Sequence, residues 1–150
     1  MAPSTQSVPI GQLPEDWQDR LLPRLLREFP NVLLVDDSKF FADILATFFK
    51  LEGFTARVAY GGMEALDALK LETPDIAFLD IVMPDLSGLE IARRLRASNA
   101  PKIPLLVALS GWDEEEHRND AAEAGFDHFM IKPVDPSSLR EFLGKLVQAS

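Results

Sequence analysis

Short apolar runs alternate with helical patterns along most of the chain, and this alternation constrains the fold more than any other feature. The apolar runs lie at residues 32–35, 55–59, 76–79, 105–109 and 128–131. Helical patterns follow them at about 38–51, 62–72, 87–98, 114–124 and 136–148. Strands that are apolar almost throughout, each followed by a helix, indicate a parallel sheet covered on both faces. The alternation therefore predicts an α/β protein with a doubly wound, five-stranded parallel sheet and five helices.

The predicted helices carry recognisable start and stop signals. Ser38 or Asp37 can cap the first helix, because either side chain accepts a hydrogen bond from a free backbone N–H. Gly53 and Gly125 follow the first and fourth predicted helices, where a glycine commonly ends a helix. These signals support the boundaries that the apolar runs predict.

The chain is acidic, lacks cysteine and has the length of one domain. Its 150 residues include 15 Lys and Arg against 24 Asp and Glu, which gives a net charge of −9. The lack of cysteine excludes disulfides, thiolate zinc sites and cysteine nucleophiles. An acidic surface repels phosphate backbones, and no apolar run approaches the roughly 20 residues of a membrane-spanning helix. These features predict a cytoplasmic protein without direct contact to nucleic acid or membrane.

The first 30 residues differ in character from the rest. Residues 1–12 are polar and without periodicity, which predicts a disordered leader. Residues 13–30 predict an amphipathic helical extension, kinked at Pro23. Its apolar stripe recurs every four residues at Leu13, Trp17, Leu21, Leu25 and Phe29. Two interpretations stay open: the extension packs back on the main domain, or it serves as a linker or a dimerisation helix.

Polar side chains follow four of the predicted strands, at the point where each strand ends. Asp36 and Asp37 follow the first strand, and Asp80 follows the third. Ser110 follows the fourth strand, and Lys132 follows the fifth. The carboxyl ends of parallel strands meet at one edge of the sheet, where doubly wound proteins bind their ligands. We therefore expect these five side chains to form one site.

The chemistry of this set points to a metal ion and a phosphoryl group. Three carboxylates in one cleft repel each other unless a cation neutralises them, and oxygen ligands without His or Cys favour Mg²⁺. A carboxylate can attack phosphorus and form an acyl phosphate. Lys132 and Ser110 supply the positive charge and the hydroxyl donor that phosphoryl oxygens require.

Residues 31–150 resemble the receiver domain of two-component response regulators. The matching segments are LLVDDS (33–38), FLDIVMPDLSG (78–88), ALSG (108–111) and FMIKP (129–133). The resemblance implies a flavodoxin-like fold with strand order 2-1-3-4-5 and a receiver domain over residues 31–150. It also implies a phosphoprotein of a phosphorelay, similar to the single-domain chemotaxis regulators.

Within that family, each matched residue has an expected role. Asp80 is expected to be the phosphoacceptor that carries the aspartyl phosphate. Asp37, Asp80 and the backbone carbonyl of Val82 are expected to ligate Mg²⁺, with Asp36 acting mostly through water. Lys132 is expected to pair with the phosphoryl group.

Three further positions have roles implied by the resemblance. The peptide bond before Pro133 is expected to be cis. Ser110 occupies the hydroxyl switch position, and Phe129 occupies the aromatic switch position. Phosphorylation is expected to draw Ser110 toward the phosphate and Phe129 inward, which changes the face formed by the fourth helix, fifth strand and fifth helix.

The function implied is a signalling receiver that takes a phosphoryl group from a histidine kinase or a His-containing phosphotransfer protein. It is expected to assist its own phosphorylation and slow dephosphorylation rather than act as an enzyme, and to bind a downstream protein through the switching face. The last helical pattern ends near Ser150, which favours a receiver without an attached output domain, and a dimer through the N-terminal helix is possible.

Three other functions are alternatives to this one. The chain could be the receiver segment of a hybrid histidine kinase, with residues 13–29 as its incoming linker. It could be a phosphorylation-independent scaffold on the same fold, although a scaffold needs none of the five site residues. An Asp-nucleophile phosphohydrolase needs an acid two residues after its nucleophile, where this chain has Ser38 and Lys39.

Two apolar residues near the site suggest a long-lived phosphoaspartate. Val82 lies two residues after Asp80, and Trp112 lies two residues after Ser110. Neither side chain can orient a water molecule for attack on phosphorus. We therefore expect slow hydrolysis of the phosphorylated protein. His117 and His128 are both expected at the surface.

Overall fold

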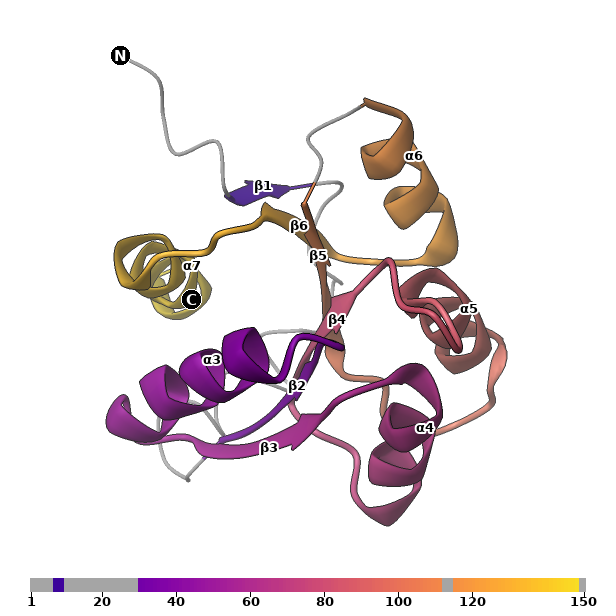
Figure 1. Ribbon diagram of the computed structural model, residues 1–150, viewed down its shortest axis with the longest axis horizontal. Coiled ribbons are helices and arrows are strands. Elements are labelled where there is room, and N and C mark those ends of the chain that lie inside the picture. Colours follow the sequence, from indigo (N-terminus) through magenta and orange to yellow (C-terminus); the bar gives the residue numbers. More distant parts are fainter. Residues whose placement is uncertain (1–6, 10–29, 112–114, 149–150) are drawn as a thin grey trace.

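The computed structural model describes residues 7–9, 30–111 and 115–148 (Figure 1). The strands are β1 (Ser7–Pro9), β2 (Asn31–Val35), β3 (Thr55–Ala59), β4 (Ile76–Asp80), β5 (Leu105–Ser110) and β6 (His128–Ile131). The helices are α3 (Lys39–Leu51), α4 (Gly62–Leu71), α5 (Gly88–Ala97), α6 (Glu115–Ala124) and α7 (Pro136–Gln148). From β2 onward, every element lies within one residue of the boundaries predicted from the sequence. Except for Pro30, the predicted helical extension lies outside the described residues, and so does Trp112.

The strands form one sheet in the order β1-β6-β5-β4-β2-β3. The five strands from β2 to β6 are parallel to one another, with Leu33 opposite Arg57 of β3 and Ala77 of β4. In chain order, this arrangement is the predicted 2-1-3-4-5 order, which is therefore confirmed. A parallel sheet of this kind brings the carboxyl ends of all five strands to one edge.

Helices cover both faces of the sheet, α3 and α7 on one side and α4, α5 and α6 on the other (Figure 1). Successive strand residues alternate between the two resulting cores, so that Leu34 packs toward α3 and α7 and Leu33 toward the other three helices. The first core is rich in aromatic rings, among them Phe49 and Phe78 with centroids 5.2 Å apart. This double cover explains why β2, β4 and β5 are buried at every position.

The helix-end signals act where the sequence placed them. The Oγ of Ser38 accepts a hydrogen bond from the backbone N–H of Phe41 at 3.4 Å, so Ser38 rather than Asp37 caps α3. Gly53 and Gly125 adopt φ angles of +97° and +104°, a region that residues with a Cβ rarely enter. Among the described helices, none is both long enough and apolar enough to span a membrane.

A short strand at the N-terminus is the main departure from the predicted architecture. Ser7–Pro9 forms β1 and pairs antiparallel with β6, with Val8 opposite Phe129. Residues 1–12 were expected to be a disordered leader, and the sequence did not indicate this strand. The physical reason is that β6 would otherwise end the sheet with unpaired backbone N–H and C=O groups. Backbone pairing at such an edge needs no periodic side-chain pattern in the added strand.

The expectation that His128 lies at the surface was wrong. Its side chain is only 5% exposed at the start of β6, and its ring centroid lies 4.6 Å from that of Phe142 on α7. Burial, with a smaller contribution from the charge of Lys145, lowers the pKa of His128 to about 4. The other histidine, His117 on α6, is half-buried.

Candidate functional site

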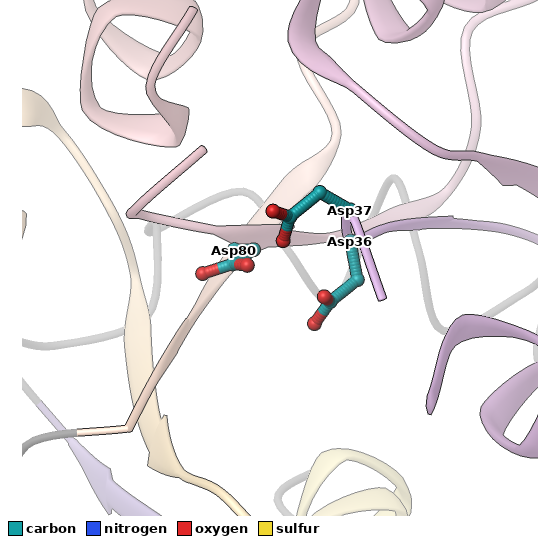
Figure 2. Close-up of side chains that lie close together, drawn as sticks. All are labelled: Asp36, Asp37 and Asp80. Atoms are coloured by element: carbon teal, nitrogen blue, oxygen red, sulfur yellow. The ribbon is translucent and has the colours of Figure 1, made fainter. Parts of the chain in front are cut away.

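The polar residues predicted to converge lie at the carboxyl edge of the parallel sheet. Asp36 and Asp37 directly follow β2, Asp80 and Ser110 are the last residues of β4 and β5, and Lys132 directly follows β6. Figure 2 shows the three aspartates side by side, with their carboxylates gathered in one place. One carboxylate oxygen from each lies within 4.8 Å of the others. Asp36 and Asp80 are buried, whereas Asp37 is exposed.

Backbone hydrogen bonds orient Asp36 at the end of the central strand β2. Its N–H donates to the carbonyl oxygen of Ala59 at 3.1 Å, which continues the pairing with β3. Its Oδ1 accepts the N–H of Ser38 at 2.9 Å. These bonds direct the Asp36 carboxylate into the sheet edge and leave Asp37 at the exposed rim.

Backbone hydrogen bonds and close packing of α5 fix the position of Asp80. The N–H of Val82 donates to its Oδ1 at 3.1 Å, and the N–H of Ile81 donates to the carbonyl oxygen of Leu109 at 3.1 Å. A Cβ placed on Gly88 would collide with the carbonyl oxygen of Asp80. The start of α5 therefore packs against the end of β4 only because residue 88 is glycine.

Lys132 joins the two buried carboxylates. Its Nζ lies 2.7 Å from Oδ2 of Asp36 and 3.2 Å from Oδ2 of Asp80. Its backbone N–H donates to the carbonyl oxygen of Ser110 at 2.8 Å, so the lysine is anchored to β5 as well as β6. The peptide bond between Lys132 and Pro133 is cis.

The charges of this cluster do not balance. Burial, and after it the neighbouring Asp36 carboxylate, raise the pKa of Asp80 to about 7, even though Lys132 offsets part of both effects. Burial alone would lower the pKa of Lys132, but the carboxylates of Asp36 and Asp80 outweigh it and raise the pKa. Asp36 and Asp80 share one ammonium and Asp37 adds a third carboxylate beside them, so a further cation would be stabilised here.

The donor atoms fit a hard divalent ion. All side-chain donors in the cluster are carboxylate oxygens, which Mg²⁺ prefers, and the two buried carboxylates share a single lysine. Asp37 and Asp80 present the oxygens that the resemblance assigns to the ion. Val82, whose backbone carbonyl completes that expected set, has a side chain that is 63% exposed on the loop after β4.

The two expected switch residues lie next to the cluster but are fully buried. Ser110 and Phe129 are both 0% exposed, on the neighbouring strands β5 and β6. The guanidinium carbon of Arg118 on α6 lies 5.6 Å from the centroid of the Phe129 ring. The ring of Phe129 therefore occupies the inward position.

Two residues around the site were not singled out from the sequence. Phe41, in the first turn of α3, places its ring centroid 5.1 Å from the Nζ of Lys132. Asp85, on the loop after β4, accepts the N–H groups of Gly62 and Met63 at 3.0 Å each, which lowers its pKa. Asp85 lies within the FLDIVMPDLSG segment, so the family motif could have drawn attention to it. No sequence signal indicated that Phe41 contacts Lys132.

Comparison with known proteins supports the assignment that the geometry suggests. The family model described as "Response regulator receiver domain" matches residues 32–143. The response regulator MprA of Mycobacterium avium is 35% identical over 116 residues, which are 77% of this chain and 49% of that protein. The Mycobacterium tuberculosis MprA is 34% identical over 116 residues, covering 77% of this chain and 48% of that protein. The chain thus spans about half the length of these relatives.

Solved structures agree with the fold. A CheY-like receiver domain from Methylobacillus flagellatus superposes with a TM-score of 0.69 at 31% identity, over 79% of this chain and 99% of that one. The receiver domain of Francisella response regulator 1452 has a TM-score of 0.71 at 29% identity, over 80% and 98% of the two chains. The family match covers most of the chain and includes every residue of the carboxylate cluster. The chain belongs to the response regulator receiver domain family.

Proposed function

We propose that this chain is a signalling receiver that accepts a phosphoryl group on Asp80 and changes its partner-binding surface in response. The observation that carries the proposal is the charge imbalance at the sheet edge, where the buried carboxylates of Asp36 and Asp80 share the ammonium of Lys132 and Asp37 adds a third carboxylate within 4.8 Å of them. A site built only for stability would pair each buried charge. This one instead favours a bound cation and an electrophile that takes up negative charge.

The proposed reaction is a transfer of PO₃ between two nucleophiles. An oxygen of the Asp80 carboxylate attacks phosphorus, and a P–O bond forms as the bond from phosphorus to the donor's imidazole nitrogen breaks. The nitrogen keeps the electron pair and takes up a proton. The Nζ of Lys132, 3.2 Å from Asp80, is positioned to pair with a phosphoryl oxygen.

A divalent ion fits this reaction. Asp37, Asp80 and the carbonyl oxygen of Val82 would hold Mg²⁺, and Asp36 would contact it mostly through water. When bound, the ion neutralises the carboxylates and the phosphoryl oxygens, which would otherwise repel each other. The buried Asp36 carboxylate keeps Lys132 at the site both before and after transfer, because the two form an ion pair at 2.7 Å.

The proposed donor is a histidine kinase or a His-containing phosphotransfer protein, which places the chain in the cytoplasm with the ATP that charges such donors. The receiver itself completes one transfer and then hydrolyses its acyl phosphate slowly. It is therefore a substrate that assists its own modification rather than an enzyme with turnover on free substrates.

The proposed output surface is the face formed by α6, β6 and α7. Phosphorylation adds charge and acceptor oxygens that attract the hydroxyl of Ser110 at the end of β5. The neighbouring α6 is suited to move, because among its side chains only Ala121 and Ala124 are buried. A helix anchored by two alanines loses little apolar contact when it shifts. A downstream protein would bind this face in one of its two arrangements.

Intact-mass measurement after incubation with MgCl₂ and acetyl phosphate tests the proposal. We expect a stoichiometric adduct of one phosphoryl group that survives acid and is lost in base. Asp80→Asn should give no adduct, while Asp67→Asn, a change at an exposed aspartate on α4, should phosphorylate like the wild type. A wild type that forms no adduct would favour a phosphorylation-independent scaffold, and turnover of varied phosphate esters would favour a hydrolase.

A further inference from the structure

The ammonium of Lys132 lies over an aromatic ring as well as between two carboxylates. The centroid of the Phe41 ring is 5.1 Å from Nζ, while Asp36 and Asp80 contact Nζ at 2.7 and 3.2 Å. The Phe41 ring is partly buried against the core between the sheet and the α3 and α7 helices. The lysine side chain is 22% exposed. Two carboxylates and one ring face thus restrict the position of the Lys132 ammonium.

These contacts belong to a closed circuit of four residues, which connects the ends of two strands. Oδ1 of Asp36 accepts the N–H of Ser38 at 2.9 Å, and Oγ of Ser38 accepts the N–H of Phe41 at 3.4 Å. The Phe41 ring contacts Lys132, and Lys132 returns to Asp36. The cap of α3 therefore connects the acidic end of β2 to the lysine that follows β6.

An aromatic ring acts on a cation in a way that an aliphatic side chain does not. The face of the ring is electron-rich and attracts an ammonium within about 6 Å. A leucine fills much of the same space but has no such face. Since the lysine side chain is long and flexible, its ammonium would otherwise move among water, Asp36 and Asp80.

We propose that Phe41 is a positioning residue that holds the Lys132 ammonium in place before a phosphoryl group arrives. The proposal rests on the proposed function of Asp80 as phosphoacceptor, and it adds a residue outside the carboxylate cluster. The contact that Phe41 makes with the site is the one to the Lys132 ammonium. Phe41 acts through Lys132, so its removal slows transfer without removing any reacting group.

A second phenylalanine on the same helix offers a matched control. Phe48 is also partly buried against the same core, and the guanidinium carbon of Arg140 lies 5.5 Å from its ring centroid. That contact is on the side of α3 where Arg140 also approaches Glu52, at the far end of the helix from Ser38. Phe48→Leu therefore removes a comparable ring and cation contact without touching Lys132.

The kinetic test measures the phosphorylation rate of the full chain against acetyl phosphate concentration at fixed MgCl₂. Phe41→Leu should lower the maximal rate about fivefold, with a smaller change in the half-saturating concentration. Phe41→Tyr, which keeps the ring face, should stay within about twofold of the wild type. Phe48→Leu should leave the rate unchanged. Equal rates for the leucine and tyrosine variants, or an equal loss in Phe48→Leu, would overturn the proposal.

A second measurement needs neither metal nor phosphoryl donor. The ¹⁵N–¹H signal of the Lys132 ammonium should be visible by NMR in the wild type and in Phe41→Tyr, because a held ammonium exchanges slowly with water. It should broaden or move in Phe41→Leu and stay in place in Phe48→Leu. An unchanged signal in Phe41→Leu refutes the proposal whether or not the protein is phosphorylated. A wild type that shows this signal but forms no adduct would instead refute phosphorylation of Asp80.

Thermal unfolding controls for a merely structural effect of the leucine variant. Phe41→Leu and Phe48→Leu should lose similar stability, since both remove a half-buried ring from one core. If Phe41→Leu does not fold, Phe41→Met keeps more volume and serves in its place for both measurements.

Discussion

The two ends of the sheet both hold buried carboxylates, but they balance their charges differently. At the amino end, Asp75 precedes β4 and accepts the N–H of Asn31 at 2.8 Å and the Nζ of Lys102 at 3.0 Å. This aspartate is 2% exposed and has a cation of its own. Its contacts connect the starts of β2 and β4 to the loop before β5.

A second pair at the amino end follows the same rule. Asp127, just before β6, accepts the N–H of Leu106 at 2.9 Å and the guanidinium of Arg96 at 2.9 Å. The Nε of Arg96 also donates to the carbonyl oxygen of Gly125 at 2.8 Å. Each of these two buried aspartates therefore contacts a cation and a backbone donor.

The carboxyl end breaks that rule. Asp36 and Asp80 share the ammonium of Lys132, and Asp37 adds a third carboxylate, with an oxygen within 4.8 Å of theirs. A buried charge without its own partner is costly, so the pKa of Asp80 is raised to about 7. Burial and ion pairing are thus common to both ends of the sheet. What distinguishes the proposed site is that two buried carboxylates share one cation.

The largest expected contrast comes from the same substitution at the two ends. Asp80→Asn should abolish phosphorylation and raise the free energy of unfolding by about 1 kcal/mol or more at pH 8, because it removes a charge that the fold disfavours. Asp75→Asn should keep phosphorylation and lower the free energy of unfolding by about 3 kcal/mol, because Lys102 loses its partner. Urea unfolding and intact-mass measurement check both. Stability changes of the same sign at both sites would contradict the comparison.

The next effect concerns pH and the amino end of β6. His128 has a pKa of about 4 in the folded protein against 6.5 for the free side chain. As the pH falls, the unfolded chain therefore binds a proton at His128 before the folded protein does. Its neutral form is compatible with the fold above pH 6.5, and stability falls as the pH drops from 6.5 toward 4. The loss should approach about 3 kcal/mol relative to His128→Phe, whose ring does not titrate.

Urea midpoints of wild type and His128→Phe between pH 7 and 4.5 measure this difference. A constant gap between the two proteins over that range would show that His128 remains protonated or accessible in the fold. His117→Phe on α6 serves as a control for the second histidine.

A smaller effect is expected for metal affinity at the carboxyl end. Asp37→Asn removes one of the three negative charges while leaving the two buried carboxylates in place, so Mg²⁺ affinity should fall by at least about 10-fold. Titration calorimetry with MgCl₂ gives the dissociation constants directly. Asp67→Asn on α4 should bind like the wild type, and a loss of equal size there would mean that overall charge, not the cluster, attracts the ion.

The smallest effect is expected for the lifetime of the phosphoaspartate. Val82 is 63% exposed beside Asp80, and Trp112 follows Ser110 by two residues in the chain. Replacing them together by Val82→Asn and Trp112→Glu adds groups that can orient water, so the adduct should decay several-fold faster. The decay is followed by mass after removal of acetyl phosphate. An unchanged half-life would mean that these two side chains do not limit the attack of water.

Much of this architecture was predictable because it depends on order along the chain. The ten elements from β2 to α7 follow from apolar runs and helix-end residues, and Ser38 caps α3 through atoms only three residues apart. The gathering of Asp36, Asp80 and Lys132 was also predictable, because parallel strands bring their carboxyl ends to one edge whatever their side chains.

The unpredicted features all depend on a partner far away in the sequence. β1 forms because β6 has an open edge, and His128 is buried because α7 places Phe142 against its ring. The contact between Phe41 and Lys132 joins the first helix of the receiver domain to the end of its last strand. Neither residue type nor spacing indicates such a contact in advance.

The pattern of residues along the chain was thus enough for the strand order and for the chemical identity of the site, because both follow from periodicity and from the geometry common to parallel sheets. Tertiary structure alone decided which cation serves which carboxylate, since Lys102 serves Asp75 while Lys132 is shared by Asp36 and Asp80. That sharing results from how the side chains pack in three dimensions. Distances of 2.7 to 3.2 Å and the exclusion of water set the strength of each electrostatic interaction.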